Sequence, residues 1–159
     1  MRTGAPCDRS LTARTRVSLA WVLSLLVGLA LTMGLPSAAR AQATAQAYEQ
    51  AQALVREKSW AAASEVVAAG LLTQPRDARL RLLQGVIAAQ QLQPEQAQGI
   101  FEALIADHPE LSEPYNNLGI LLAQRSDVQG ARQQFEKALL ADPQNAQAQS
   151  NLARLATPQ

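Results

Sequence analysis

Few residues of this chain could take part in catalysis, and those few are isolated from one another. The chain of 159 residues contains one histidine, His108, and one cysteine, Cys7. His108 could titrate near neutral pH, but it stands in the sequence Asp107-His108-Pro109, where the proline marks a turn, so we expect a structural or solvent-exposed role. The sequence contains no phosphate-binding loop, no G-x-S-x-G motif and no metal-ligand cluster such as H-E-x-x-H. We therefore predict no catalytic residue, no cofactor and no metal, and a protein that is not an enzyme.

The charge distribution gives no reason to expect an anionic partner. The formal net charge is +1. Residues 1–41 contain a single acid, Asp8, and the arginines Arg2, Arg9, Arg14, Arg16 and Arg40, whereas residues 42–159 contain nine basic and twelve acidic side chains. We therefore expect neither nucleic acid nor an anionic lipid surface as a partner. Alanine, leucine and glutamine are abundant and only 4% of the residues are aromatic, a composition that favours helices.

The N-terminal segment has the layout of a secretory signal peptide. A polar, arginine-bearing stretch is followed by residues 17–35, which are uncharged and mostly apolar, and then by Pro36. Ala39-Arg40-Ala41 offers small residues at the two positions that a signal-peptide cleavage site requires. We therefore predict a cleavable signal peptide over residues 1–41, a mature chain that begins at Gln42, and export to a bacterial periplasm. Cys7 would leave with the leader.

An uncleaved membrane anchor is the alternative for the same segment. The apolar run over 17–35 approaches the length that spans a bilayer. In that case the protein would stay attached to the inner membrane and face the periplasm, and the membrane would count among its partners.

The remainder of the chain repeats with a fixed period of about 34 residues, which is typical of stacked helical repeats. In such stacks each unit buries its apolar face against the next. Four kinds of residue keep the period: prolines, alanines, glycines and large apolar residues. They are Pro75, Pro109 and Pro143; Ala63, Ala97 and Ala131; Gly85 and Gly119; and Val67, Phe101 and Phe135.

The third unit carries the clearest pattern, namely Tyr115, Leu118-Gly119, Leu122, Ala131, Phe135, Ala138 and Pro143. The tetratricopeptide pattern is W-x2-L-G-x2-Y, then A-x3-F, then P. With Tyr115 in place of the tryptophan and Leu122 in place of the tyrosine, the chain resembles the tetratricopeptide-repeat family over residues 44–157. The first unit departs most, since Ala51 replaces the glycine.

This resemblance implies an all-α fold, an α-solenoid of three helix-turn-helix repeats followed by a C-terminal capping helix. The expected repeats are residues 44–77, 78–111 and 112–145, and the capping helix is 146–157. We expect helices at 44–57, 60–72, 78–91, 94–107, 113–125, 128–141 and 145–157, with Asp77, Ser112 and Asn145 as N-terminal caps. Gly85 and Gly119 are expected to face Ala97 and Ala131 across each helix pair.

The resemblance also implies a concave, partner-binding face on the first helix of each repeat. The columns that would line it hold Tyr48, Gln52, Val55, Arg79, Leu82, Val86, Glu113, Asn116, Ile120 and Arg154. Asn117 and Asn151 share a further column, and such asparagines hold a ligand's backbone in some family members, although they can equally serve helix packing.

The family's basic clamp for a C-terminal carboxylate is not matched, because its positions carry Tyr48, Gln52, Leu83 and Glu113. We therefore expect a non-catalytic scaffold or adaptor that binds a protein or peptide in the envelope, with no small-molecule substrate. A structural, self-assembling protein is the alternative.

Overall fold

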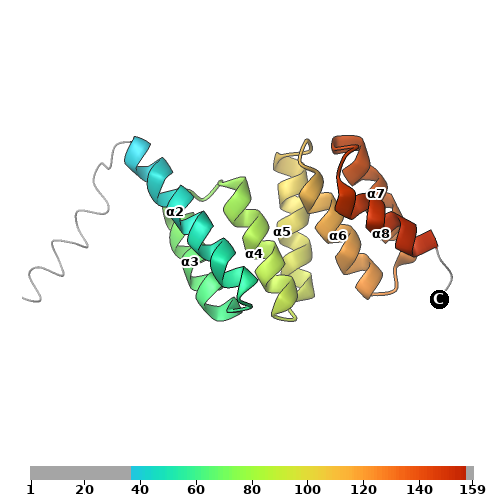
Figure 1. The fold of residues 1–159 in the computed structure, drawn as a ribbon, viewed down its shortest axis with the longest axis horizontal. Coiled ribbons are helices and arrows are strands. Elements are labelled where there is room, and N and C mark those ends of the chain that lie inside the picture. Colours follow the sequence, from blue (N-terminus) through green and yellow to red (C-terminus); the bar gives the residue numbers. More distant parts are fainter. Residues whose placement is uncertain (1–36, 157–159) are drawn as a thin grey trace, which may run out of the picture. The chain divides into compact units, whose positions relative to one another are not determined.

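The computed structural model describes residues 37–156, which form seven helices. They are α2 (Ser37–Arg56), α3 (Trp60–Thr73), α4 (Ala78–Gln90), α5 (Pro94–Asp107), α6 (Ser112–Gln124), α7 (Val128–Ala141) and α8 (Ala146–Ala156). Figure 1 shows them in chain order. Contacts between residues group the chain into two compact units, residues 1–39 and residues 40–159. All seven helices belong to the second unit, except that the first residues of α2 belong to the first. Within residues 37–156, none of the helices combines the length and hydropathy needed to cross a membrane. The predicted apolar leader segment, residues 17–35, lies outside the described residues.

The all-α fold of paired helices is confirmed, and almost every predicted helix boundary is correct to within one residue. The exception is α2, which begins at Ser37 instead of residue 44, so the predicted cleavage site after Ala41 falls inside this helix. Pro36 directly precedes α2, and residues 37–43 are mostly alanine with arginine and glutamine, which are strong helix formers. The first buried residue of α2 is Thr44, so packing begins beyond the predicted cleavage site.

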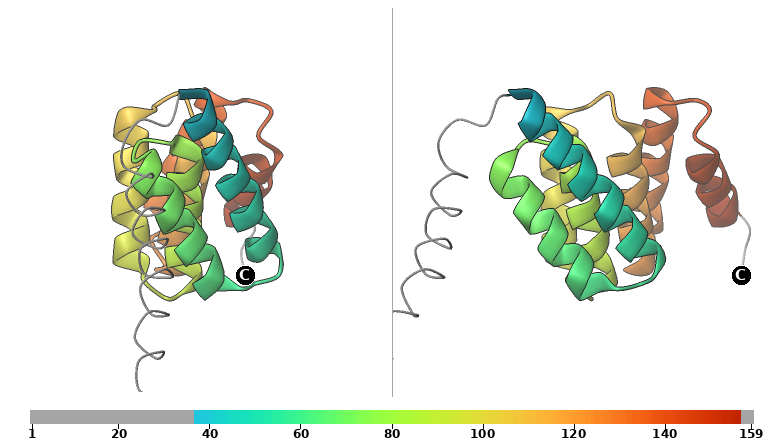
Figure 2. Two further views of the ribbon diagram at one scale, coloured as in Figure 1. Left: turned by 90° about the vertical axis from the view of Figure 1, so that its left-hand side faces the viewer. Right: turned by 60° about the vertical axis from the view of Figure 1, so that its left-hand side comes forward.

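Consecutive helices pack in pairs, and the first helices of successive pairs also meet. Turns of three residues join α2 to α3, α4 to α5 and α6 to α7. Helix α4 contacts α5 and α6, and α6 contacts α7 and α8. In the left-hand view of Figure 2, α2 and α8 lie on the side opposite to α5. Since Tyr48 of α2 also lies against Arg79 of α4, the first helices α2, α4, α6 and α8 share one side of the stack.

The alanines, glycines and large apolar residues that keep the repeat period form the core, whereas the repeated prolines are exposed. Ala63, Ala97 and Ala131 are 0% exposed. Phe101 and Phe135 are 1% and 2% exposed, and each lies one helical turn after the repeated alanine. Burial of these columns explains why their residue types recur, since each repeat must present the same shape to its neighbour.

The nearest neighbour of each repeated glycine is a phenylalanine and not the predicted alanine. A Cβ atom added to Gly85 would meet the Phe101 ring, with Cδ1 and Cζ both at 2.9 Å, and one added to Gly119 would lie 2.5 Å from Phe135 Cε1. The nearest atoms thus belong to the phenylalanine and not to Ala97 or Ala131. The glycine makes room for an aromatic ring, which then fills the space between the paired helices.

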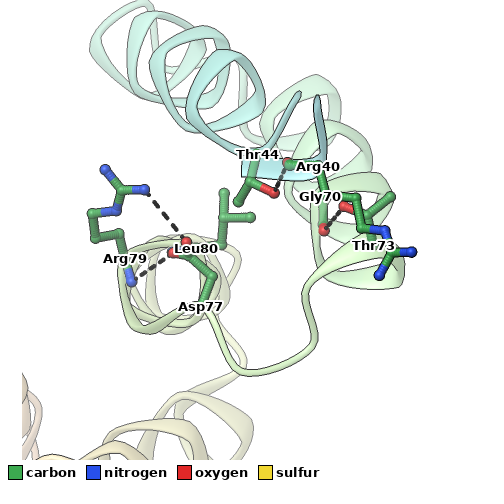
Figure 3. Close-up of polar contacts among 7 residues, drawn as sticks. All are labelled: Arg40, Thr44, Gly70, Thr73, Asp77, Arg79 and Leu80. Carbon is green, nitrogen blue, oxygen red and sulfur yellow. Dashed lines mark hydrogen bonds and ion pairs between the residues drawn. The ribbon is translucent and has the colours of Figure 1, made fainter. Parts of the chain in front are cut away.

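Side-chain caps explain where several helices begin. The Asp77 carboxylate accepts hydrogen bonds from the backbone N–H groups of Arg79 and Leu80, both at 3.0 Å (Figure 3). Asn145 Oδ1 accepts from Ala148 N at 3.0 Å, so this predicted cap is confirmed as well. Ser112 does not cap α6, because it is already the first helical residue and Leu111 precedes it. Its buried hydroxyl instead accepts a hydrogen bond from Asn145 Nδ2 at 2.9 Å, which links the starts of α6 and α8.

The turns inside the repeats share an unpredicted feature. Lys58, Leu92 and Ser126 have φ angles of 59°, 59° and 64°, in the left-handed region. They stand exactly one repeat period apart, so each repeat makes the same turn between its two helices. None of the three is glycine, the residue that adopts this conformation without strain.

We expect Leu92→Gly to raise the free energy of unfolding by about 0.5–1 kcal/mol, because it relieves left-handed strain at a side chain that is 88% exposed. Leu140→Gly is the matched control, since Leu140 is 83% exposed but helical and its replacement should lower stability by up to about 1 kcal/mol. Urea unfolding followed by circular dichroism gives both values. A loss of stability in Leu92→Gly would contradict the turn geometry.

Candidate functional site

The predicted concave-face residues lie on α2, α4, α6 and α8, which share one side of the stack. Their exposure divides them into three groups. Arg79, Glu113 and Arg154 are exposed; Asn116 is buried; and the half-buried ones are Tyr48, Gln52, Val55, Leu82, Val86, Asn117, Ile120 and Asn151. A surface of mostly half-buried side chains offers apolar area together with polar atoms, as a binding surface requires.

At the α2 end, the side chains are already engaged with one another. Gln52 Nε2 donates a hydrogen bond to the Tyr48 hydroxyl at 2.8 Å, and Gln52 Oε1 accepts one from Arg56 Nη2 at 2.8 Å. The Arg79 guanidinium on α4 lies 5.0 Å from the centroid of the Tyr48 ring, a distance at which a cation is attracted to the ring face. This end of the surface is thus an ordered polar cluster that joins α2 to α4.

At the α8 end, the structure corrects the predicted role of Asn116. Its side chain is 1% exposed, and its Oδ1 accepts a hydrogen bond from Asn151 Nδ2 at 3.0 Å. The amide of Asn116 therefore joins α6 to α8 and is not available to a bound peptide. Asn117, the next residue, stays half-buried on the surface, because adjacent residues of a helix point about 100° apart.

The centre of the surface holds a small pocket between α4 and α6, with a volume of about 110 Å³. It is lined by Val86, Ala89, Gln90, Phe101, Asn117, Ile120, Leu121 and Gln124. A second, wider pocket of about 640 Å³ lies between α6, α7 and α8. Its lining consists of Ile120, Ala123, Gln124, Ser126, Val128, Phe135, Asn151, Arg154 and Leu155. Ile120 borders both pockets, so the predicted residues Val86, Asn117, Ile120, Asn151 and Arg154 are brought together here.

The histidine and the carboxylates do not line these pockets, and Arg154 is the one ionisable side chain among the lining residues. His108 follows the last residue of α5, and its Nδ1 is 3.3 Å from Glu110 Oε1. Within the described part of the chain, no group of three or more histidine, cysteine, aspartate or glutamate side chains could hold a metal ion. The pockets themselves are lined mainly by apolar side chains and amides, with Ser126 and Arg154 in the second pocket, which are groups suited to binding.

One ion pair at the edge of the helix stack gives a pH-dependent prediction. Arg81 Nη1 donates to Asp107 Oδ2 at 2.6 Å, and this hydrogen bond holds the pKa of the Asp107 carboxyl below its ordinary value of 3.8. A carboxyl with a lowered pKa stabilises the fold above its unfolded-state pKa and loses that contribution as the pH falls through its folded-state pKa. We therefore expect the stability advantage of the wild type over Asp107→Asn to be constant above about pH 5 and to shrink below about pH 4.

Denaturant unfolding over a pH series from neutral to strongly acidic tests this expectation, which concerns the difference between two variants and not the total stability. In an Arg81→Met background, Asp107→Asn should lose most of its pH-dependent effect, because the donor that lowers the pKa is absent. The same pH-dependent difference with and without Arg81 would contradict the assignment.

Comparisons with known proteins agree with this arrangement. The family model for the tetratricopeptide repeat matches residues 88–146 and 116–157. No curated protein sequence matches the chain at a significant level.

Three solved structures show how far the similarity extends. The first tetratricopeptide domain of Spaghetti (RPAP3), bound to the HSP90 peptide SRMEEVD, is 15% identical with a TM-score of 0.64, covering 72% of this chain and 91% of that one. The Sgt2 domain from Aspergillus fumigatus is 18% identical with a TM-score of 0.65, and the alignment covers 70% of this chain and 76% of that one. The second tetratricopeptide domain of human RPAP3, in complex with the HSP70 peptide SGPTIEEVD, is 18% identical with a TM-score of 0.64. The alignment covers 75% of this chain and 99% of that one. At such identities the similarity concerns the fold.

Proposed function

We propose that this chain is a non-catalytic adaptor built of tetratricopeptide repeats, which binds a segment of another protein on the side formed by α2, α4, α6 and α8. The observation that carries this proposal is the pair of pockets that meet at Ile120 on that side. They combine buried aromatic floors with amide rims, which suits the side chains and backbone of a peptide.

The partner is expected to differ from the chaperone tails bound in two of the similar structures. Those peptides end in the acidic sequence EEVD. In this chain the positions of the family's carboxylate clamp carry Tyr48, Gln52, Leu83 and Glu113. Leu83 is only 9% exposed, and Glu113 is an exposed acid that would repel a carboxylate. An acidic C-terminal tail therefore has no basic clamp to bind.

We further propose that the adaptor works in a bacterial periplasm or cell envelope, after cleavage of residues 1–41. The leader-like sequence is the support for this location. Cleavage after Ala41 is compatible with the fold, because the buried residues of α2, Thr44 and Ala51, both belong to the mature part. The hydrogen bond from the Thr44 hydroxyl to Arg40 O, 2.9 Å long and drawn in Figure 3, would be lost.

Mass spectrometry of the protein recovered from a periplasmic extract tests the location. The expected N-terminal residue is Gln42. Recovery of the intact leader in the membrane fraction would favour the anchored alternative, and recovery from the cytoplasm alone would contradict export.

The binding function is tested by affinity capture from an envelope extract with wild type, Ile120→Glu and the control Leu140→Glu. Ile120 borders both pockets, so a carboxylate there would be buried against any apolar ligand group, at a cost of several-fold to a hundredfold in affinity. Leu140 lies on α7, lines neither pocket and is 83% exposed. We expect partners that Leu140→Glu retains and Ile120→Glu loses. Identical partners for all three proteins would remove this surface from the proposal.

A further inference from the structure

The two pockets are the same site, repeated one period apart. Shifting the residues that line the first pocket by one repeat reproduces most of the lining of the second. The matching pairs are Val86 and Ile120, Ala89 and Ala123, Gln90 and Gln124, Phe101 and Phe135, Asn117 and Asn151, Ile120 and Arg154, and Leu121 and Leu155. The floor of each pocket is thus the phenylalanine that fills the space beside a repeated glycine, and the packing of the repeat builds the pocket.

The lining of the first pocket defines what it can accept. None of its eight lining residues is charged. The amides of Gln90, Asn117 and Gln124 have no side-chain hydrogen-bond partner among the described residues, and they surround an apolar floor that includes Phe101. A volume of about 110 Å³ is smaller than the apolar cavity of about 150 Å³ that holds benzene. The pocket therefore fits one aliphatic side chain, and the amides can bond to the adjacent peptide groups.

The second pocket differs in size and in part of its lining, since Ser126 and Val128 line it in addition. Its volume is about 640 Å³, so it has room for a larger side chain, including an aromatic one. Arg154 stands where Ile120 stands in the first pocket. The phenylalanine floor, one glutamine and one asparagine are retained, and Asn151 Oδ1 can still accept while Nδ2 donates to Asn116.

The first repeat does not continue this series. At the register of Phe101 it has the smaller Val67, and at the register of Asn117 it has Leu83. Gln52, at the register of Val86, is already bonded to Tyr48 and Arg56. Within the described residues, the series therefore offers two corresponding pockets and does not extend to the first repeat.

We infer that the partner segment is an extended stretch with two apolar side chains, one for each pocket, and this inference rests on the proposed function. The two pockets lie on either side of α6, so they are separated by about one helix spacing, roughly 8–10 Å. A chain in the extended polyproline II conformation advances about 3.1 Å per residue with three residues per turn, so side chains three positions apart lie on the same face and about 9 Å from each other. The partner is thus recognised by the spacing of its apolar side chains and by its backbone amides.

A peptide array with the full chain as probe tests this directly. The peptides are uncharged, capped at both ends and built on a serine-glycine background, with two leucines separated by one to seven positions. We expect the strongest binding at a separation of three, about tenfold or more above single-leucine peptides, since each leucine buries its own apolar area. Equal binding at all separations, or stronger binding to a peptide that ends in EEVD, would overturn the inference.

Two variants separate the pockets from each other and from the wider surface. Ala89→Leu fills the first pocket, and Ala123→Leu places a larger side chain in the wall of the wider second pocket, where it takes up space needed by an incoming leucine. The fold tolerates a larger side chain here because Val55 occupies the same register in the first repeat. Each should reduce binding of the best two-leucine peptide to the single-leucine level, and Leu140→Ala should not. Thermal melts establish that the variants are folded.

Capture of the natural partner by these variants distinguishes a failure of this inference from a failure of the proposed function. If capture depends on Ile120 but is unchanged in both Ala89→Leu and Ala123→Leu, the two-pocket inference is wrong and the adaptor function stands. If capture is also insensitive to Ile120→Glu, the proposed function fails first.

Discussion

Phe135→Ala is expected to lower the free energy of unfolding by about 3–5 kcal/mol, the largest effect of any single substitution considered for this fold. Phe135 is 2% exposed, and its ring lies directly against the backbone of Gly119 in the neighbouring helix. Truncation would leave a cavity between α6 and α7, because the flanking side chains cannot move far enough to fill it. A loss of this size is a large share of the roughly 5–15 kcal/mol that stabilise a typical domain.

Urea unfolding followed by circular dichroism measures this effect, with Leu140→Ala as the control on the same helix. Leu140 is 83% exposed, so its truncation should change stability by less than about 0.5 kcal/mol. A loss below about 1 kcal/mol for Phe135→Ala would mean that the ring is not the packed core residue described above.

Gly119→Ala is the second large effect, and its direction is the opposite of what helix propensity alone predicts. In an exposed helix, alanine is favoured over glycine by about 1 kcal/mol. Here the added Cβ would lie 2.5 Å from Phe135 Cε1, closer than real Cβ contacts allow, and the buried ring has little room to yield. We therefore expect a net loss of about 1–3 kcal/mol.

Gly99→Ala is the matched control for this substitution. Gly99 is an exposed residue within α5, and a Cβ there would meet nothing within 4 Å. The same change should therefore raise stability by about 0.5–1 kcal/mol. In a Phe135→Ala background, Gly119→Ala should also become stabilising, because the obstructing ring is gone. Two losses of equal size for Gly119→Ala and Gly99→Ala would contradict the glycine–phenylalanine packing.

The helices and their pairing were predictable because local and long-range signals agree. Pro94 begins α5, Asp77 caps α4, and the repeat period fixes the order of the helix pairs. The early start of α2 was not predicted, because the family resemblance begins at residue 44, whereas the helix extends further on the intrinsic propensity of its residues.

The contacts between helices could be predicted only in part. The sequence indicates that Gly85 and Ala97 are small and repeated, but the rotation of the paired helices decides that Phe101 lies against the glycine. Similarly, Asn116 and Asn117 are adjacent and chemically identical. Only the position of α8 decides that Asn116 is buried against Asn151 while Asn117 remains on the surface.

The left-handed turns at Lys58, Leu92 and Ser126 gave no residue-type signal, since glycine and asparagine are the usual residues there. Their common spacing of one repeat period would have identified them only after the turn geometry of one repeat was known.

Site-specific photo-crosslinking tests most directly whether the side formed by α2, α4, α6 and α8 binds the partner. A photoreactive phenylalanine derivative is placed at Ile120, which borders both pockets, or at Leu140 on the exposed surface of α7. We expect irradiation in cells to link a discrete partner through position 120 and not through position 140. Adducts that form through position 140 alone would place the binding surface elsewhere and contradict the proposed function.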